Sequence, residues 1–118
     1  MTYFIVIEKH AEKFLDKLDF SIQKEFDRLI LEELAKNPLP LNKKHILDTK
    51  GNSLLCELDF KKWRVYYIYT NETILIAQIS FDGIVRILDG YSNHKSGSNN
   101  WSNQKKIITK LKKEFKRK

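Results

Sequence analysis

The chain has 118 residues, of which 42% are hydrophobic and 31% charged, and its formal net charge is +7. This length suits one compact domain over residues 1–118 and leaves no room for a second, and the single cysteine, Cys56, excludes an internal disulfide. No apolar run approaches the roughly 18 residues of a membrane-spanning helix, and no export signal is recognisable, so we expect a cytoplasmic protein.

The first third of the chain predicts a short strand and a pair of helices. Residues 2–7 are mostly β-branched or aromatic, as is typical of strands. Apolar residues recur at helical spacing around residues 11–18 and again from Ile22 to Lys36, and residues 19–21 between them include good N-capping side chains. Asn37-Pro38 ends the second helix, because proline supplies no amide hydrogen and restricts the residue before it. We expect the two helices to form a hairpin.

The middle of the chain predicts a connector and then a sheet. The connector, Leu41–Ser53, is polar, carries Lys43, Lys44 and His45, and ends with a turn signal at Gly51-Asn52. Four strands with short turns between them should follow as an antiparallel meander over residues 54–60, 63–70, 73–81 and 84–89. Together with the first strand and the helical hairpin, this predicts an α+β fold with these helices on one face of the sheet.

Arg64 interrupts an otherwise apolar strand, residues 63–69. The period of two places Arg64 beside Tyr66 on one face, while the alternate side chains face the core. A desolvated arginine cannot lose its charge and therefore needs an anionic partner. Glu57 or Asp59 on the preceding strand could fill this role within the protein, and an anionic ligand could fill it from outside. Both alternatives stay open at this stage.

The end of the chain holds the excess positive charge. Residues 1–100 contain 14 basic and 14 acidic residues, whereas residues 101–118 contain eight basic residues and only Glu114 as an acid. Gly90–Asn100 predicts a loop, and Ser102 is expected to cap a final basic helix. Its apolar stripe is Ile107, Ile108, Leu111 and Phe115. Such a helix suggests contact with phosphate or with an acidic partner, although a solvated face would give the same pattern.

The residues suited to chemistry are cationic or able to transfer protons. His10, His45 and His94 are too widely spaced for a metal motif, and the four glycines form no phosphate-binding loop, so we predict no metal and no cofactor. A base, an acid and a guanidinium together suit RNA cleavage that starts at a 2′-hydroxyl. His94 is the natural acid or base, but an exposed loop histidine is the commoner case for such a sequence. Tyr91 could stack on a base or cover the edge of the core.

Four short motifs recur in a recognisable order along residues 3–95. They are Phe14–Asp19 with Gln23, Asn37-Pro38, Lys43-Lys44 before Gly51, and Trp63–Tyr67. Their arrangement resembles the RelE/ParE superfamily of bacterial toxins, and the basic helix over residues 102–118 looks like an extension found in some members. The resemblance implies a toxin of a type II toxin–antitoxin system, with an antitoxin and the ribosome as partners.

The RelE-like branch, by this resemblance, cleaves mRNA in the ribosomal A site. The matching positions assign Arg64 to the transition-state charge and Tyr91 or His94 to acid or base catalysis. The predicted RNA-binding residues are Lys43, Lys44 and Lys95, joined by Lys105 and Lys106 of the final helix. The general base stays open, because Glu57 and Asp59 stand where strongly ribosome-dependent members tend to place lysines.

Two other functions stay open beside the endoribonuclease. ParE-like members share the fold and inhibit DNA gyrase without cutting RNA, and a plain nucleic-acid-binding module would also explain the basic helix.

Overall fold

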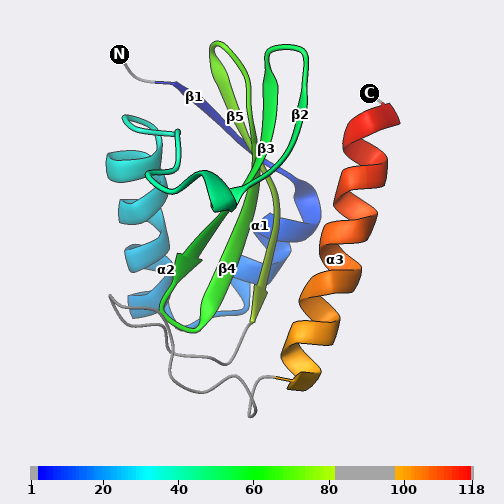
Figure 1. The fold of residues 1–118 in the computed structure, drawn as a ribbon. Coiled ribbons are helices and arrows are strands. Elements are labelled where there is room, and N and C mark those ends of the chain that lie inside the picture. Colours follow the sequence, from blue (N-terminus) through cyan, green and yellow to red (C-terminus); the bar gives the residue numbers. More distant parts are fainter. Residues whose placement is uncertain (1–2, 82–97, 118) are drawn as a thin grey trace.

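The computed structural model describes residues 3–81 and 98–117 (Figure 1). Its elements in chain order are β1 (Phe4–Ile7), α1 (Lys9–Asp16), α2 (Phe20–Arg28), the π-helical segment η1 (Leu29–Leu34), the 3₁₀ turn η2 (Lys43–His45), β2 (Ile46–Lys50), β3 (Ser53–Phe60), β4 (Trp63–Tyr69), β5 (Thr73–Phe81) and α3 (Ser98–Arg117). The strands form one five-stranded sheet in the order β1-β5-β4-β3-β2. The predicted α+β class is confirmed.

The sheet is mixed because its first strand is parallel to its neighbour. β1 pairs with β5 in parallel, and β2, β3, β4 and β5 follow one another as an antiparallel meander. Three of the four predicted meander strands are therefore present, and β2 precedes them as a strand that was not predicted. The strand predicted over residues 84–89 lies outside the described residues.

The prediction of a connector over Leu41–Ser53 is wrong for residues 46–50, which form the edge strand β2. Ile46 packs against the core on one face of the sheet and Leu47 against the core on the other. Asp48, Thr49 and Lys50 complete the strand, and an edge position tolerates such polar residues. Their polarity hid the strand because tertiary pairing, not local pattern, stabilises it.

The helical hairpin covers one face of the sheet, as predicted. α1 and α2 with η1 bury Ala11, Leu15, Phe26, Ile30 and Leu34 against that face. The second helix ends before Asn37-Pro38 as expected, although its last turns are π-helical rather than α-helical. The Tyr67 hydroxyl donates a hydrogen bond of 2.6 Å to the Pro38 carbonyl, which ties the chain beyond the helix to the sheet.

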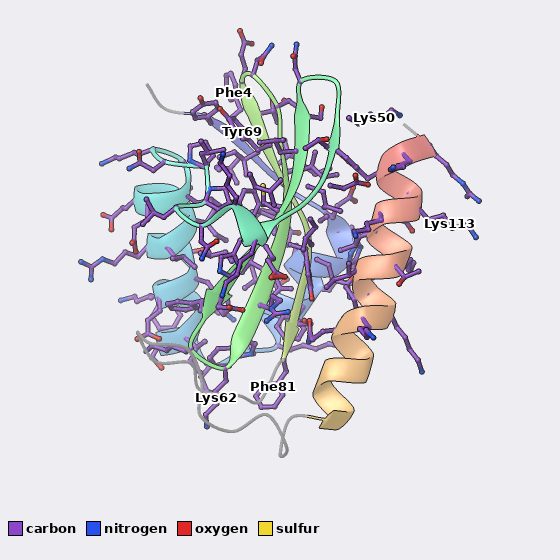
Figure 2. All side chains as sticks on the ribbon, in the orientation of Figure 1. Phe4, Lys50, Lys62, Tyr69, Phe81 and Lys113 are labelled. Atoms are coloured by element: carbon purple, nitrogen blue, oxygen red, sulfur yellow. The ribbon has the colours of Figure 1, made fainter. Side chains whose placement is uncertain are left out.

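α3 covers the other face of the sheet, which the sequence had not assigned to any helix (Figure 1). The two innermost members of its predicted apolar stripe, Leu111 and Phe115, pack with Leu55, Tyr66 and Ala77. Most of its basic side chains are exposed, and Lys113 points away from the sheet (Figure 2). Across the described part of the chain, we find no helix with the length and apolar character needed to span a membrane.

The predicted cap of the final helix is also wrong. α3 begins at Ser98, so Ser102 lies inside the helix rather than at its start. No glycine or proline occurs between the two serines, so nothing in the sequence stops the first turn from extending towards the N-terminus.

Candidate functional site

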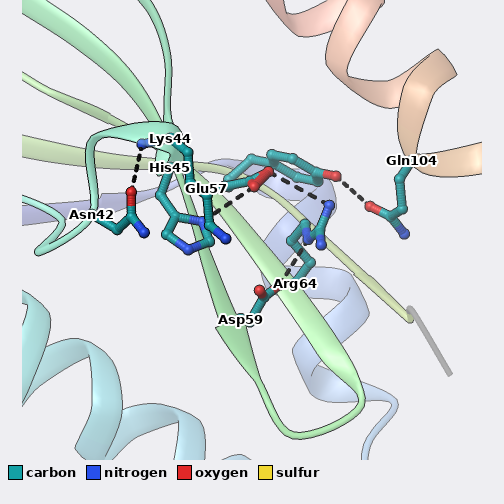
Figure 3. A network of polar contacts seen from close by, with 8 residues as sticks. Asn42, Lys44, His45, Glu57, Asp59, Arg64 and Gln104 are labelled. Carbon is teal, nitrogen blue, oxygen red and sulfur yellow. Dashed lines mark hydrogen bonds and ion pairs between the residues drawn. The ribbon is translucent and has the colours of Figure 1, made fainter. Parts of the chain in front are cut away.

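A buried ion-pair network surrounds Arg64 on β4. Its Nε donates to Asp59 Oδ1 at 2.8 Å, and its Nη1 lies 3.5 Å from Glu57 Oε1 (Figure 3). The register explains both contacts, because Asp59 is directly opposite Arg64 on β3 and Glu57 is two residues away on the same face. The side chain of Arg64 is only 4% exposed. The protein's own carboxylates therefore supply the anionic partner that the sequence predicted for Arg64.

The electrostatics keep Arg64 charged. Burial lowers the pKa of its guanidinium, but the charges of Asp59 and Glu57 oppose this effect and leave the pKa raised overall. The guanidinium in turn offsets the cost of burying two carboxylates.

His45 extends this network to the surface. It is the last residue of the 3₁₀ turn η2, which the Asn42 side chain caps by accepting a hydrogen bond of 3.0 Å from the Lys44 amide. Ile46 pairs with Cys56 in the antiparallel register, so the preceding His45 comes to lie beside Glu57. The distance from His45 Nδ1 to Glu57 Oε2 is 3.3 Å, and the histidine side chain is 28% exposed. The carboxylate of Glu57 thus connects the buried guanidinium of Arg64 to the accessible imidazole of His45.

α3 contributes a buried polar group to the same face of the sheet. The Tyr66 hydroxyl donates to Gln104 Oε1, and the Ser80 hydroxyl lies 3.1 Å from the same oxygen. Gln104 is 1% exposed. Figure 3 shows the helix approaching the network from the side opposite His45. This contact anchors the helix at a defined position over the sheet.

A groove of about 770 Å³ opens beside the network, which is within the usual range of ligand pockets. His45, Glu57 and Asp59 form one wall together with Leu58 and Tyr67. The remaining lining comes from the end of the helical hairpin and the chain that follows it, namely Leu29, Glu32, Glu33, Leu34, Asn37, Leu39, Pro40, Leu41 and Asn42. The groove therefore combines apolar surface with a proton-transfer group.

A scan of protein-family models finds no match for this sequence, and a search of curated proteins finds none either. Solved structures are similar in fold. A chain of the archaeal RelE–RelB complex from Pyrococcus horikoshii OT3 is 24% identical, with a TM-score of 0.59 over 70% of this chain and 98% of that one. A chain of the RelBE2 toxin–antitoxin complex from Mycobacterium tuberculosis is 18% identical, with a TM-score of 0.54 over 69% of this chain and 92% of that one. The fold is that of RelE.

Four of the five predicted RNA-binding residues are exposed close to residues of the polar network. Lys43 and Lys44 are exposed in the turn that carries His45, and Lys105 and Lys106 are exposed on α3 directly after the buried Gln104. The two lysine pairs thus flank the polar network at opposite ends. Three predicted residues, Tyr91, His94 and Lys95, lie outside the described residues.

The pairing of His45 with Glu57 was not predicted. The sequence placed His45 in a polar connector, and without β2 nothing set it opposite Glu57. The available signal was the pair Ile46-Leu47, two apolar residues directly after the histidine, which is a weak indication of a short strand.

Cys56 lies close to the network but is buried in the core, as predicted. Burial raises the pKa of its thiol to about 11, so it is protonated near neutral pH and is a poor nucleophile. In residues 3–81 and 98–117, no three histidine, cysteine or acidic side chains cluster as metal ligands would.

Proposed function

We propose that this protein is the toxin of a type II toxin–antitoxin pair and cleaves mRNA on the ribosome, in the cytoplasm. Both RelE-fold chains named above come from complexes with an antitoxin, which supports an antitoxin as partner here. Because one fold hosts several functions, the site must carry the enzymatic part of the proposal. The observation that carries it is the network from buried Arg64 through Glu57 to accessible His45, beside exposed lysines.

The proposed reaction is an attack of a ribose 2′-hydroxyl on the adjacent phosphorus, with departure of the 5′-oxygen. The exposed Lys43 and Lys44 supply positive charge where the phosphate would lie. Arg64 holds in place the two carboxylates that shape the site, and its side chain is only 4% exposed. Its direct contact with the phosphate, which the resemblance implies, stays a prediction. Tyr91 and His94 stay candidates for the acid that protonates the leaving oxygen.

The products of cleavage test the proposed chemistry. We expect a 2′,3′-cyclic phosphate and a 5′-hydroxyl at the cut mRNA when the purified protein acts on programmed ribosomes. A 2′-O-methyl group at the cleaved nucleotide should abolish the cut, because it removes the attacking hydroxyl. On isolated RNA, any cleavage should continue in excess EDTA. Products with 5′-phosphates would contradict the proposal, and end mapping by ligation with and without phosphatase distinguishes the two.

Growth arrest offers a second, independent measurement. Expression of the protein should arrest growth while mRNA is being cut. Arrest without RNA cleavage, relieved by overproduction of DNA gyrase, would favour the ParE-like alternative instead.

The lysines of α3 are expected to strengthen RNA association through phosphate contacts. Replacing four exposed residues, Lys105, Lys106, Lys110 and Lys113, by Gln should weaken binding at low salt. Each lost contact should also reduce the log–log salt slope by about one unit. Binding isotherms at several salt concentrations measure both effects.

A matched control replaces four exposed lysines of the helical hairpin and the turn after it, namely Lys9, Lys13, Lys24 and Lys36. This variant has the same change in net charge and should retain more of the affinity and slope. Equal losses in the two variants would show that only net charge matters. An unchanged affinity in the α3 variant, together with loss of antitoxin binding, would identify the helix as an interface for the antitoxin.

A further inference from the structure

The imidazole of His45 contacts a carboxylate through one ring nitrogen, and the side chain is partly exposed to solvent. Nδ1 lies 3.3 Å from Glu57 Oε2, and 28% of the side chain is exposed. A neutral imidazole carries one N–H, and a carboxylate beside Nδ1 selects the tautomer that donates from Nδ1. Nε2 is then left with its lone pair and can accept a proton. A histidine oriented in this way by a carboxylate is the arrangement of a general base.

Glu57 is itself held at both oxygens. Oε2 faces His45, and Oε1 lies 3.5 Å from Arg64 Nη1, so the carboxylate has little freedom to rotate (Figure 3). Its side chain is only 10% exposed, which strengthens the interaction with the imidazole relative to a solvated pair. The backbone of His45 is fixed as well, because its amide donates to the Asn42 carbonyl at 3.0 Å. Backbone and side chain are both preorganised.

We propose that His45 is the general base of RNA cleavage and that Glu57 is its positioning residue; the inference rests on the proposed function. Nε2 of His45 takes the proton of the 2′-hydroxyl while the 2′-oxygen forms a bond to phosphorus. The bond from phosphorus to the 5′-oxygen breaks, and that oxygen takes a proton from a general acid or from water. His45 then returns its proton to solvent. The substrate class is RNA with a free 2′-hydroxyl, and no co-reactant is needed.

The charged groups around His45 are compatible with this role. Lys43 and Lys44 on its own turn are exposed and can attract a phosphate. Across the groove, Glu32 and Glu33 belong to η1, and Glu32 forms an ion pair of 3.2 Å with Arg28. The carboxylates of Glu57 and Asp59 on β3 share Arg64 as their counterion.

The test replaces His45 by Asn, which can keep a donor to Glu57 but removes the base. We expect kcat on programmed ribosomes to fall by about 10²–10⁴-fold with KM little changed. Added imidazole should restore part of the lost activity, which a merely structural role for His45 would not allow. The matched control is His10→Asn, at an exposed histidine on α1, and it should behave like the wild type.

A second measurement does not depend on activity. Nitrogen-15 NMR of the histidine ring should show His45 with its proton on Nδ1 in the wild type and a mixed tautomer in Glu57→Gln. A folded His45→Asn variant with full activity, or a wild-type ring protonated on Nε2 alone, would overturn the inference while the proposed function stands. A folded wild-type protein that does not cut RNA on ribosomes would overturn both.

Discussion

Arg64→Ala is expected to lower the free energy of unfolding by about 3–5 kcal/mol, because it leaves two carboxylates in a mostly buried site without their shared cation. The side chain is 4% exposed and contacts Asp59 at 2.8 Å and Glu57 at 3.5 Å. Urea denaturation followed by circular dichroism measures the loss. The effect on stability must be known before any loss of RNA cleavage in this variant is assigned to catalysis.

The matched control is Arg28→Ala, which removes an exposed arginine from a surface ion pair. Arg28 is 79% exposed and lies 3.2 Å from Glu32, so its loss should cost less than about 1 kcal/mol. Adding Glu57→Gln and Asp59→Asn to Arg64→Ala should recover part of the lost stability, because the buried negative charges are then gone. A loss below about 1 kcal/mol in Arg64→Ala would contradict the view that this network is a structural element.

Phe115→Ala is expected to destabilise the protein by about 3–5 kcal/mol, the usual cost of removing a buried phenyl group. Phe115 is 4% exposed and packs with Leu111 of α3 against Leu55, Tyr66 and Ala77 of the sheet. Denaturant unfolding measures the total effect. Hydrogen exchange of the α3 amides shows whether the helix separates from the sheet before the rest unfolds.

Phe20→Ala is the matched control for this prediction. Phe20 is 69% exposed, so its removal should change stability by no more than about 0.5 kcal/mol. Equal stability of the Phe115→Ala variant and the wild type would mean that the helix contributes little to the fold. In that case α3 could separate from the face of the sheet that carries Arg64 at little cost in free energy.

The elements with a strong local signal were predictable from sequence. Residues at helical spacing formed α1 and α2, and the alternating segments formed β3, β4 and β5 close to their expected bounds. The apolar stripe of the last helix also predicted its buried side, because amphipathic periodicity is a property of neighbouring residues. The resemblance to RelE, carried by short motifs in order, predicted the fold at a level confirmed by solved structures.

Arg64 shows how much of the candidate site can be predicted from local sequence. Its position in an apolar strand identified a charge that needed an anion, and the strand before it offered Glu57 and Asp59. The sequence could name both candidates because adjacent antiparallel strands place nearby residues opposite each other. The structure shows that Arg64 contacts both carboxylates.

The sequence by itself determined the helical hairpin, most of the sheet and the charge that must be compensated. Only the tertiary structure decided that polar residues 46–50 form a strand, that this strand sets His45 beside Glu57, and that α3 brings Gln104 to Tyr66. The physical reason is distance along the chain. Periodicity and turn chemistry act over a few residues, whereas the contacts of His45 with Glu57 and of Tyr66 with Gln104 join residues 12 and 38 positions apart. Their free energy comes from burial and hydrogen bonds that exist only once the sheet has formed.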